Sequence, residues 1–514
     1  MGRSMAFGMK YAIMHQLDHI YALTVRKTMR HLVTVLLLTF LPGLAVAQTF
    51  GGYNTSPDAG IYGIYTNPAT AASTHFKWDV NIAGAHAVAG NTYISFAKSA
   101  LRADTLKRGV DYFQDTSSKR YQFGWAQADI LMPSVLYSID ETQSVAFTWR
   151  VRGMANAGPV SPRVLNFTTI RFPNPQYIGN TLYIDNAAGT FNSWNEFGFT
   201  YARVLKENQL SRLKGGITVK YLSGIVSGYT AISNTSFTVN SSTSMSINSG
   251  HAIYGYSENM DSANRAGQSY YNLTRYPGVG ADIGFTWEWR PDPEGGDGAN
   301  YGSNGYFNDD ADAYVLRLGV SVTDIGGINY SNSPYSTSLD LRKADIDPHT
   351  LDKRKGESYS KWYSRIKQYF TPDGPRQVSY YMQLPTALHL TADYQFGGGW
   401  AASANAVFGL NTNAKNNFRN NMITMLQLTP RYEHGWWSAF LPTSVNRYAG
   451  VDVGVGVRLG PVLLGSSSIL SDLVSSKIKR ADVFLAVRLW PMKAGKEGKT
   501  SAEKRALRQV KCAL

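Results

Sequence analysis

Residues 451–460 read VDVGVGVRLG, and this stretch decides the fold. Its odd positions are Val, Val, Val, Val and Leu, whereas its even positions are Asp, Gly, Gly, Arg and Gly. Successive side chains of a β-strand point to opposite sides, so one face of this strand is aliphatic and the other is small or charged. A strand between hydrocarbon and a polar interior has this pattern.

The same alternation recurs along the chain, for example in residues 143–153, 195–205, 278–290 and 380–396. Such segments number about 14 to 16, and bacterial single-chain barrels favour even strand numbers. We therefore predict an all-β fold, a transmembrane antiparallel β-barrel of about 14–16 strands with an N-terminal hatch segment. A soluble sandwich or propeller would also have aliphatic inner faces. The Trp and Tyr residues on the aliphatic face and an export leader favour the barrel.

The first 47 residues have the pattern of a secretory signal peptide. Basic residues precede the apolar run 32–41, and Ala-Val-Ala at 45–47 is a small-x-small cleavage site. We expect residues 1–28 to be an overextended start. The predicted divisions are a signal peptide (1–47), a hatch or plug (48–77), a transmembrane barrel (78–490) and a basic periplasmic tail (491–514).

The composition excludes several classes of protein. The formal net charge is +14, but residues 1–47 carry five Lys/Arg and one Asp, and residues 493–514 carry seven Lys/Arg and two Glu. Only +5 remains for the segment between them, and this small excess is not the charge pattern of a nucleic-acid-binding protein. The single cysteine, Cys512, excludes an internal disulfide framework and a cysteine metal cluster.

Motifs for catalysis are missing from the sequence. It has no G-x-S-x-G elbow, no H-E-x-x-H pair and no Walker loop. The acidic loop at 291–312 has calcium-like spacing but lacks the glutamate that an EF-hand needs. We expect no enzyme activity, no cofactor and no metal site. The histidines of the mature chain are scattered: His75, His86, His251, His349, His389 and His434.

A second long connection, residues 329–376, contains aromatic and aliphatic residues at helical spacing in 349–370. This pattern predicts an amphipathic helix. The helix is expected to pack on the barrel mouth; the alternatives are that it caps the lumen or docks a partner.

Charged residues on the polar face of the predicted strands should point into the lumen. They could brace a filled barrel or line a path for a solute. Inward glycines favour the brace, because glycine lets a plug pack closely. The predicted lumen residues are Arg150, Arg152, Glu196, Lys220, Asp282, Glu288, Arg290, Arg317, Asp393, Asp452, Arg458 and Arg488.

Several motifs resemble those of one known family. They are the hatch motif Asn67-Pro68-Ala69, GITVKYL at 216–222, GADIGF at 280–285, LGVSVTDIG at 318–326 and LPTAL at 384–388. In these motifs the chain resembles the FadL-like outer-membrane barrels, which include the PorV-type proteins of type IX secretion. The resemblance implies a barrel of about 14 strands with a hatch, acting on hydrophobic small molecules, which such proteins pass laterally, or on secreted proteins. The 329–376 insertion and the basic tail depart from the family pattern.

The leading hypothesis is therefore a FadL/PorV-type barrel of the cell outer membrane, acting in transport or secretion. Its expected partners are outer-membrane lipid and a hydrophobic small molecule or a secretion protein, and no nucleic acid. The alternative is a structural or partner-docking barrel with a sealed lumen; an enzyme would need a Ser/His pair. For the strand at 451–460, we expect Val455→Arg to impair assembly far more than Gly456→Ser.

Overall fold

A computed structural model describes residues 50–489 apart from short internal segments. The signal peptide, the tail from residue 490 and the acidic loop at 291–313 therefore lie outside the described residues, and the predictions about them remain predictions. The other segments left out are 103, 105, 117–119, 163, 166–176, 209, 263–271, 355, 358, 411–417, 447 and 449.

The chain forms a closed antiparallel β-barrel of 14 strands, as the alternation predicted. Four of these strands are each interrupted once and so comprise two segments: β4 with β5, β15 with β16, β19 with β20, and β21 with β22. The barrel elements are β1 (Trp78–Asn91), β4 (Gln122–Leu131), β5 (Ser134–Ser138), β6 (Gln143–Val160), β7 (Thr181–Glu207), β8 (Ser211–Val239), β10 (Pro277–Trp289), β11 (Leu316–Ser331), β15 (Ser379–Gln383), β16 (Ala387–Gly397), β17 (Trp400–Gly409), β18 (Met425–His434), β19 (Trp437–Phe440), β20 (Thr443–Asn446), β21 (Gly450–Val453), β22 (Val455–Leu459), β23 (Val462–Ser466) and β24 (Arg480–Leu489).

Proline explains three of the four interruptions. Pro133, Pro385 and Pro442 each lie between the two segments of one strand. Proline has no N–H to give to the ladder, so pairing stops locally and resumes beyond it. The barrel closes where β1 pairs with β24 over ten registered positions, from Val80 opposite Leu489 to Gly90 opposite Arg480.

The two faces of the wall differ as the sequence predicted. Val451, Val455 and Leu459 are 61%, 37% and 45% exposed on the outside, whereas Asp452 and Arg458 are buried inside. An aliphatic outer surface of this kind is compatible with the hydrocarbon of a membrane, and the polar residues point away from that hydrocarbon into the lumen. The fold is therefore a transmembrane barrel.

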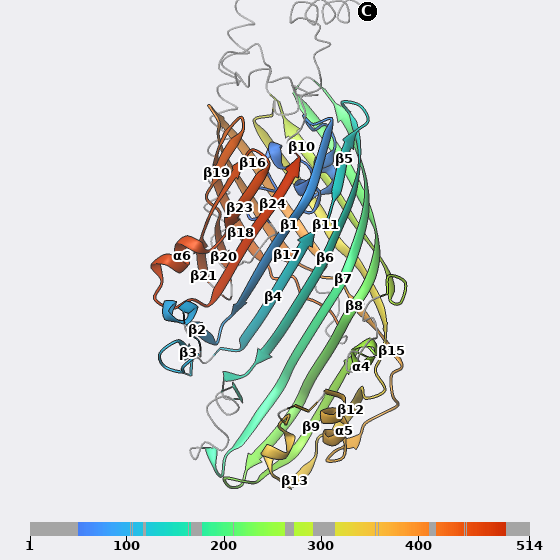
Figure 1. Cartoon of the computed structure of the whole chain (residues 1–514), viewed down its shortest axis with the longest axis vertical. Coiled ribbons are helices and arrows are strands. Elements are labelled where there is room, and N and C mark those ends of the chain that lie inside the picture. Colours follow the sequence, from blue (N-terminus) through green and yellow to red (C-terminus); the bar gives the residue numbers. More distant parts are fainter. Residues whose placement is uncertain are drawn as a thin grey trace, which may run out of the picture.

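Two strands continue far beyond the barrel and extend its sheet on one side. β7 and β8 have 27 and 29 residues, their distal halves pair with each other, and β8 also pairs there with β9 (Met245–Tyr256). Figure 1 shows this extension at the bottom of the view, covered by the insertion. Its remaining elements are α4 (Asn259–Ser262), β12 (Thr337–Asp340), β13 (Lys343–Ile346), η5 (Pro348–Leu351), α5 (Tyr359–Lys367) and β14 (Thr371–Pro372).

The predicted helix at 349–370 is shorter than expected and lies elsewhere. It is divided into η5 and α5, and α5 packs on the extension sheet rather than over the lumen. The ring of Tyr363 stacks on Tyr254 of β9, with centroids 4.1 Å apart. Tyr363, Ile366, Tyr369 and Phe370 of the pattern thus share a hydrophobic cluster with β9 residues.

Residues 50–77 lie inside the barrel, at the end where the short β5–β6, β7–β8 and β22–β23 turns are found. We call this the hatch end, and the opposite one the distal end. The hatch contains η1 (Pro57–Ala59), α2 (Ile61–Ile64) and η2 (Pro68–Ala71), and α2 is wholly buried. Its apolar side chains share a core with wall residues such as Phe440 and Phe484. Among the described residues, no helix is long and apolar enough to cross a membrane.

Candidate functional site: the hatch and the filled lumen

The Asn67-Pro68-Ala69 motif forms the start of η2 and binds the wall. Proline occupies the first helical turn, where its missing N–H costs nothing. The Asn67 side chain accepts from the Ala69 N–H at 3.0 Å and so caps the turn. Its amide nitrogen donates to the Phe285 carbonyl of β10 at 3.0 Å. One side chain therefore shapes the hatch and anchors it.

Three glycines on the inner face of β8, β10 and β11 make room for this motif. A Cβ on Gly216 would lie 2.5 Å from the carbonyl carbon of Pro68, and one on Gly284 would lie 2.1 Å from the Asn67 side-chain oxygen. A Cβ on Gly319 would lie 3.1 Å from the Asn67 nitrogen. We call these three residues the glycine seat, because larger side chains would collide with the hatch.

Ion pairs, buried on the wall side, hold the other end of the hatch. Asp58 accepts from Arg458 of β22 at 2.6 Å and lies 3.1 Å from the His75 ring nitrogen. Arg488 of β24 donates to the Asp58 carbonyl at 2.9 Å and reaches Asp79 of β1 at 3.4 Å. Buried charges of this kind are tolerated only when paired, so the hatch and the wall complete each other.

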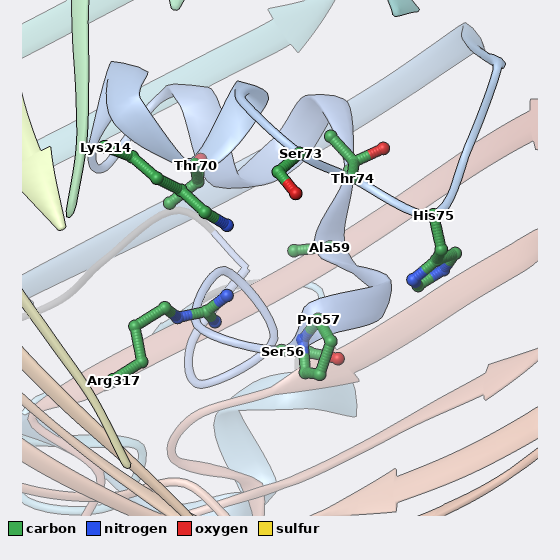
Figure 2. A pocket seen from close by; sticks show the side chains of 10 residues that line it. Ser56, Pro57, Ala59, Thr70, Ser73, Thr74, His75, Lys214 and Arg317 are labelled. Atoms are coloured by element: carbon green, nitrogen blue, oxygen red, sulfur yellow. The ribbon is translucent and has the colours of Figure 1, made fainter. Parts of the chain in front are cut away.

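Little space remains between the hatch and the wall at this level. Figure 2 shows a cavity into which Lys214 and Arg317 point from the wall, with Ser73 and Thr74 on the hatch side. Its volume is about 20 Å³, and a neighbouring cavity between Asn67 and the wall measures about 10 Å³. The first has room for a water molecule and neither has room for a solute such as a sugar.

The middle of the lumen holds a network of charges. Arg152 donates to Asp324 at 2.8 Å and to Asp129 at 3.1 Å, and Lys220 reaches Asp282 and Asp324 at 2.7 Å each. These side chains come from β4, β6, β8, β10 and β11, and the network crosses the lumen between them.

Glu196 of β7 completes this network. It accepts from Arg150 at 2.6 Å and from Arg152 at 3.3 Å, and the Trp194 indole donates to it at 3.3 Å. The network members are buried and mutually compensated, so they brace the barrel.

An aromatic layer lies on the distal side of the charges. Tyr330 and Tyr380 stack at 5.5 Å, and Tyr276 and Tyr229 pack against them at 5.0 and 4.8 Å. The Tyr330 hydroxyl donates to Asn192 at 2.7 Å. The lumen is therefore apolar at the distal end, charged in the middle and occupied by the hatch at the other end.

The structure places the predicted lumen residues on the inner side of the wall. Ten of the twelve are buried; Arg317 and Arg290 are partly exposed, and Arg290 pairs with Glu207 at the hatch end. They do not form one site. The rest of the predicted set pairs locally, as Glu288 with Lys214, Asp393 with Arg431, and Asp452 with Arg480.

Sequence reasoning did not include several partners in that set. Asp129, Lys214 and Arg431 have inward parity in their strands, so the alternation could have found them. Asp324 has the wrong parity. A bulge places Thr323 and Asp324 together opposite Asp282, and the positive φ of Asp324 (57°) turns its side chain inward.

No group of three or more His, Cys, Asp or Glu side chains within the described ranges is arranged to hold a metal ion. No Ser/His pair was predicted, and the buried His389 instead contacts Thr323 at 3.0 Å. The chemistry of the lumen is therefore one of packing, hydrogen bonding and ion pairing.

A family model covers most of this architecture. The model, described as a family of unknown function (DUF5723), matches residues 68–467, from the hatch motif to the end of β23. The chain belongs to this family. No curated protein matches the sequence.

Several solved structures are similar to this chain. The toluene transporter TbuX of Ralstonia pickettii matches 87% of this chain and 97% of its own at 9% identity, with a TM-score of 0.38. The toluene transporter TodX of Pseudomonas putida matches 84% and 93% at 9% identity, with a TM-score of 0.33. A FadL homologue of Pseudomonas aeruginosa matches 87% and 99% at 10% identity, with a TM-score of 0.23. FadL-family proteins are thus among the matches, as the motifs predicted, but at these identities and scores they do not bear on what this chain carries.

Proposed function

We propose that the protein is an outer-membrane transporter for small apolar molecules, closed by residues 50–77. Its even strand number and the short β5–β6, β7–β8 and β22–β23 turns at the hatch end fit an orientation with the hatch at the periplasmic side and the extension outside the cell. The observation that carries the proposal is the order of layers in the lumen. An apolar molecule arriving from outside would meet the aromatic layer of Tyr229, Tyr276, Tyr330 and Tyr380 first.

Passage through the lumen requires the hatch to move. The cavities beside it, about 20 and 10 Å³, are too small for any such molecule. The Asn67 contacts are two hydrogen bonds from one amide nitrogen to wall carbonyls, at 3.0 and 3.4 Å, and together they contribute only about 1 kcal/mol net or somewhat more. Opening of the lumen therefore requires residues 50–77 to leave the wall as one unit, at the Asn67 end and at the Gly51 end.

A reversible lock tests this directly. Gly51 of the hatch lies against Ser467, and a Cβ on Gly51 would be 3.4 Å from the Ser467 Cβ. Disulfides have Cβ atoms about 3.5–4.5 Å apart, so Gly51→Cys with Ser467→Cys should form one. The variant is made in a Cys512→Ser background, and uptake of an apolar fluorescent dye is measured with and without reductant.

Oxidation should suppress dye uptake and reduction should restore it, whereas either single-cysteine variant should not respond to reductant. Uptake that is equal in both states would contradict hatch movement. Absence of uptake in both states and in the unmodified protein would contradict transport itself.

The filled lumen favours a second candidate, a sealed barrel that docks a secreted or secretion-machinery protein of the PorV kind. The extension beyond the membrane offers the surface for it, since β7, β8 and β9 continue there as a sheet. Deleting residues 337–376 should abolish partner capture under this candidate and leave dye uptake intact under the first.

A further inference from the structure

A shallow groove crosses the outer wall of the barrel, on the face that meets lipid. Its volume is about 690 Å³, within the range of small-molecule sites, and its lining is almost wholly apolar. Two rows of mostly small, mutually registered residues form its floor. One row is Ala481, Ala89, Ala126, Ala155 and Phe191, and the other is Val483, Ala87, Ala128, Gly153 and Ser193.

The groove is closed at one side and open at the other. Toward the hatch end the next registered row includes the bulky residues Leu485, Ile130 and Val151. Toward the distal end the small residues continue with Gly124 opposite Ala157. The groove therefore leads from the hydrocarbon region toward the distal rim.

Two loops join the distal ends of the strands that form the groove. One connects β1 to β4 and contains β2 (Ile94–Phe96), η3 (Lys98–Arg102) and β3 (Tyr112–Gln114); the other connects β23 to β24 and contains α6 (Ile469–Val474). Figure 1 shows β2, β3 and α6 next to each other beside these strand ends. Phe96 pairs with Ile478, and the Lys98 ammonium donates to the Leu473 carbonyl at 2.5 Å. The loops thus form one surface.

This surface combines cations with protruding apolar side chains. Leu106, Val110, Leu473 and Val474 are 53%, 59%, 61% and 88% exposed, as residues that enter a membrane interface would be. Asp104, Asp111, Asp115 and Asp472 are also present, but Asp111 is buried and bonded to Ser99 and the Lys107 N–H, and Asp115 lies 3.7 Å from Lys479. The exposed cations are Lys98, Arg102, Lys107, Arg108, Arg120 and Lys477.

We call the exposed cations and apolar residues just named the rim patch. Lys479 lies between the rim patch and the groove. It lies two residues before Ala481, just ahead of the start of β24, and its side chain is 38% exposed. A molecule with an apolar chain in the groove would therefore have its head among the cations.

We propose that the groove and the rim patch together bind an anionic lipid of the surrounding leaflet. An acyl chain lies against the alanine rows, and phosphate groups of the headgroup lie against the rim cations. Small residues on a lipid-facing wall let another molecule approach the backbone closely, and rim charge selects which lipid does so. The inference is independent of transport through the lumen.

Native mass spectrometry of the purified full-length protein tests the proposal, with lipid A as the probe and its dephosphorylated form and phosphatidylcholine as comparisons. Lipid A should bind at least about tenfold more tightly than either, and 1 M salt should abolish most of the difference because charge is screened within roughly 3 Å. Equal binding of the three lipids would overturn the proposal without any variant.

Two sets of variants divide the site. Replacing Lys98, Lys107, Arg108 and Lys477 by Gln should remove the preference for phosphate, whereas the same change at four basic residues of the extension should not. Ala128→Phe should weaken the binding of all three lipids because the ring fills the groove, and Ala404→Phe on the opposite wall should leave their binding unchanged. A quadruple rim variant that still prefers lipid A would contradict the proposal. So would unchanged lipid binding by Ala128→Phe, once heat-modifiable migration has shown that this variant is folded. The control residues of the extension are Lys343, Arg354, Lys367 and Arg376.

Discussion

The glycine seat makes the attachment of the hatch measurable. In Gly216→Ala the new methyl group would lie 2.5 Å from the Pro68 carbonyl carbon and 2.6 Å from the Ala69 nitrogen. Both are backbone atoms, so no side chain can rotate away. Overpacking of this kind costs about 1–3 kcal/mol. If the hatch shifts, it also loses hydrogen bonds from Asn67 to two wall carbonyls, which contribute about 1 kcal/mol net together or somewhat more.

The sum, about 2–4 kcal/mol, raises the undocked population of η2 by roughly 30- to 700-fold, since 1.4 kcal/mol is a factor of ten. Hydrogen exchange of the amides in residues 61–72, measured in nanodiscs, should accelerate by a comparable factor where exchange follows local opening. The barrel strands should keep their protection.

Gly124→Ala provides the control, because its nearest neighbour would be 3.9 Å from the new Cβ. Exchange in residues 61–72 should then equal that of the unaltered protein. If the amides of residues 61–72 exchange equally slowly in Gly216→Ala and in the unaltered protein, and heat-modifiable migration shows a folded barrel, the glycine seat does not hold the hatch.

The remaining predictions concern other parts of the molecule. Arg152→Met leaves three buried carboxylates without this partner and should lower the free energy of unfolding by about 3–5 kcal/mol, as measured by denaturant titration in lipid. Val455→Arg should cost roughly 2–4 kcal/mol and slow assembly in heat-modifiable gels, whereas Val455→Leu should not. Hydrogen bonds from Arg365 lower the pKa of Glu357 to about 2, so its contribution to α5 docking should be complete above about pH 4.5 and lost as the pH falls toward 2; the ¹⁹F signal of fluorotryptophan at Trp362 should report this, and Glu357→Gln should remove it. Cys512 should resist an impermeant maleimide in intact cells if the tail is periplasmic.

The alternation of the sequence predicted the barrel because lipid and lumen impose opposite requirements on successive residues. It could not predict Asp324, since a bulge changes the parity at that point of β11. It also could not predict the extension, because β7 and β8 continue beyond the barrel as ordinary paired strands.

The strand at 451–460 illustrates the same limit. Gly456 faces inward as predicted, but a Cβ there would lie 2.1 Å from the Phe440 ring, so Gly456→Ser also has a packing cost. That Val455→Arg impairs assembly more than Gly456→Ser stays a prediction. Alternation states which side a residue faces and not what fills the space beside it. The neighbour comes from β19, which pairs with β22 at this position.

The inner glycines of this barrel lie where other groups pack closely against the wall. A Cβ on Gly224 of β8 would lie 2.6 Å from the Tyr330 ring, and one on Gly465 of β23 would lie 2.5 Å from the Phe484 ring, just as Cβ atoms on the glycine seat would collide with the hatch. A water-filled pore has no reason to keep such positions bare, because a larger side chain would simply extend into solvent. Filled and open barrels should therefore differ in the glycine content of their inward positions, at equal alternation on the outer face. By this criterion the described lumen of the chain is built to be occupied, and transport through it depends on displacing what occupies it.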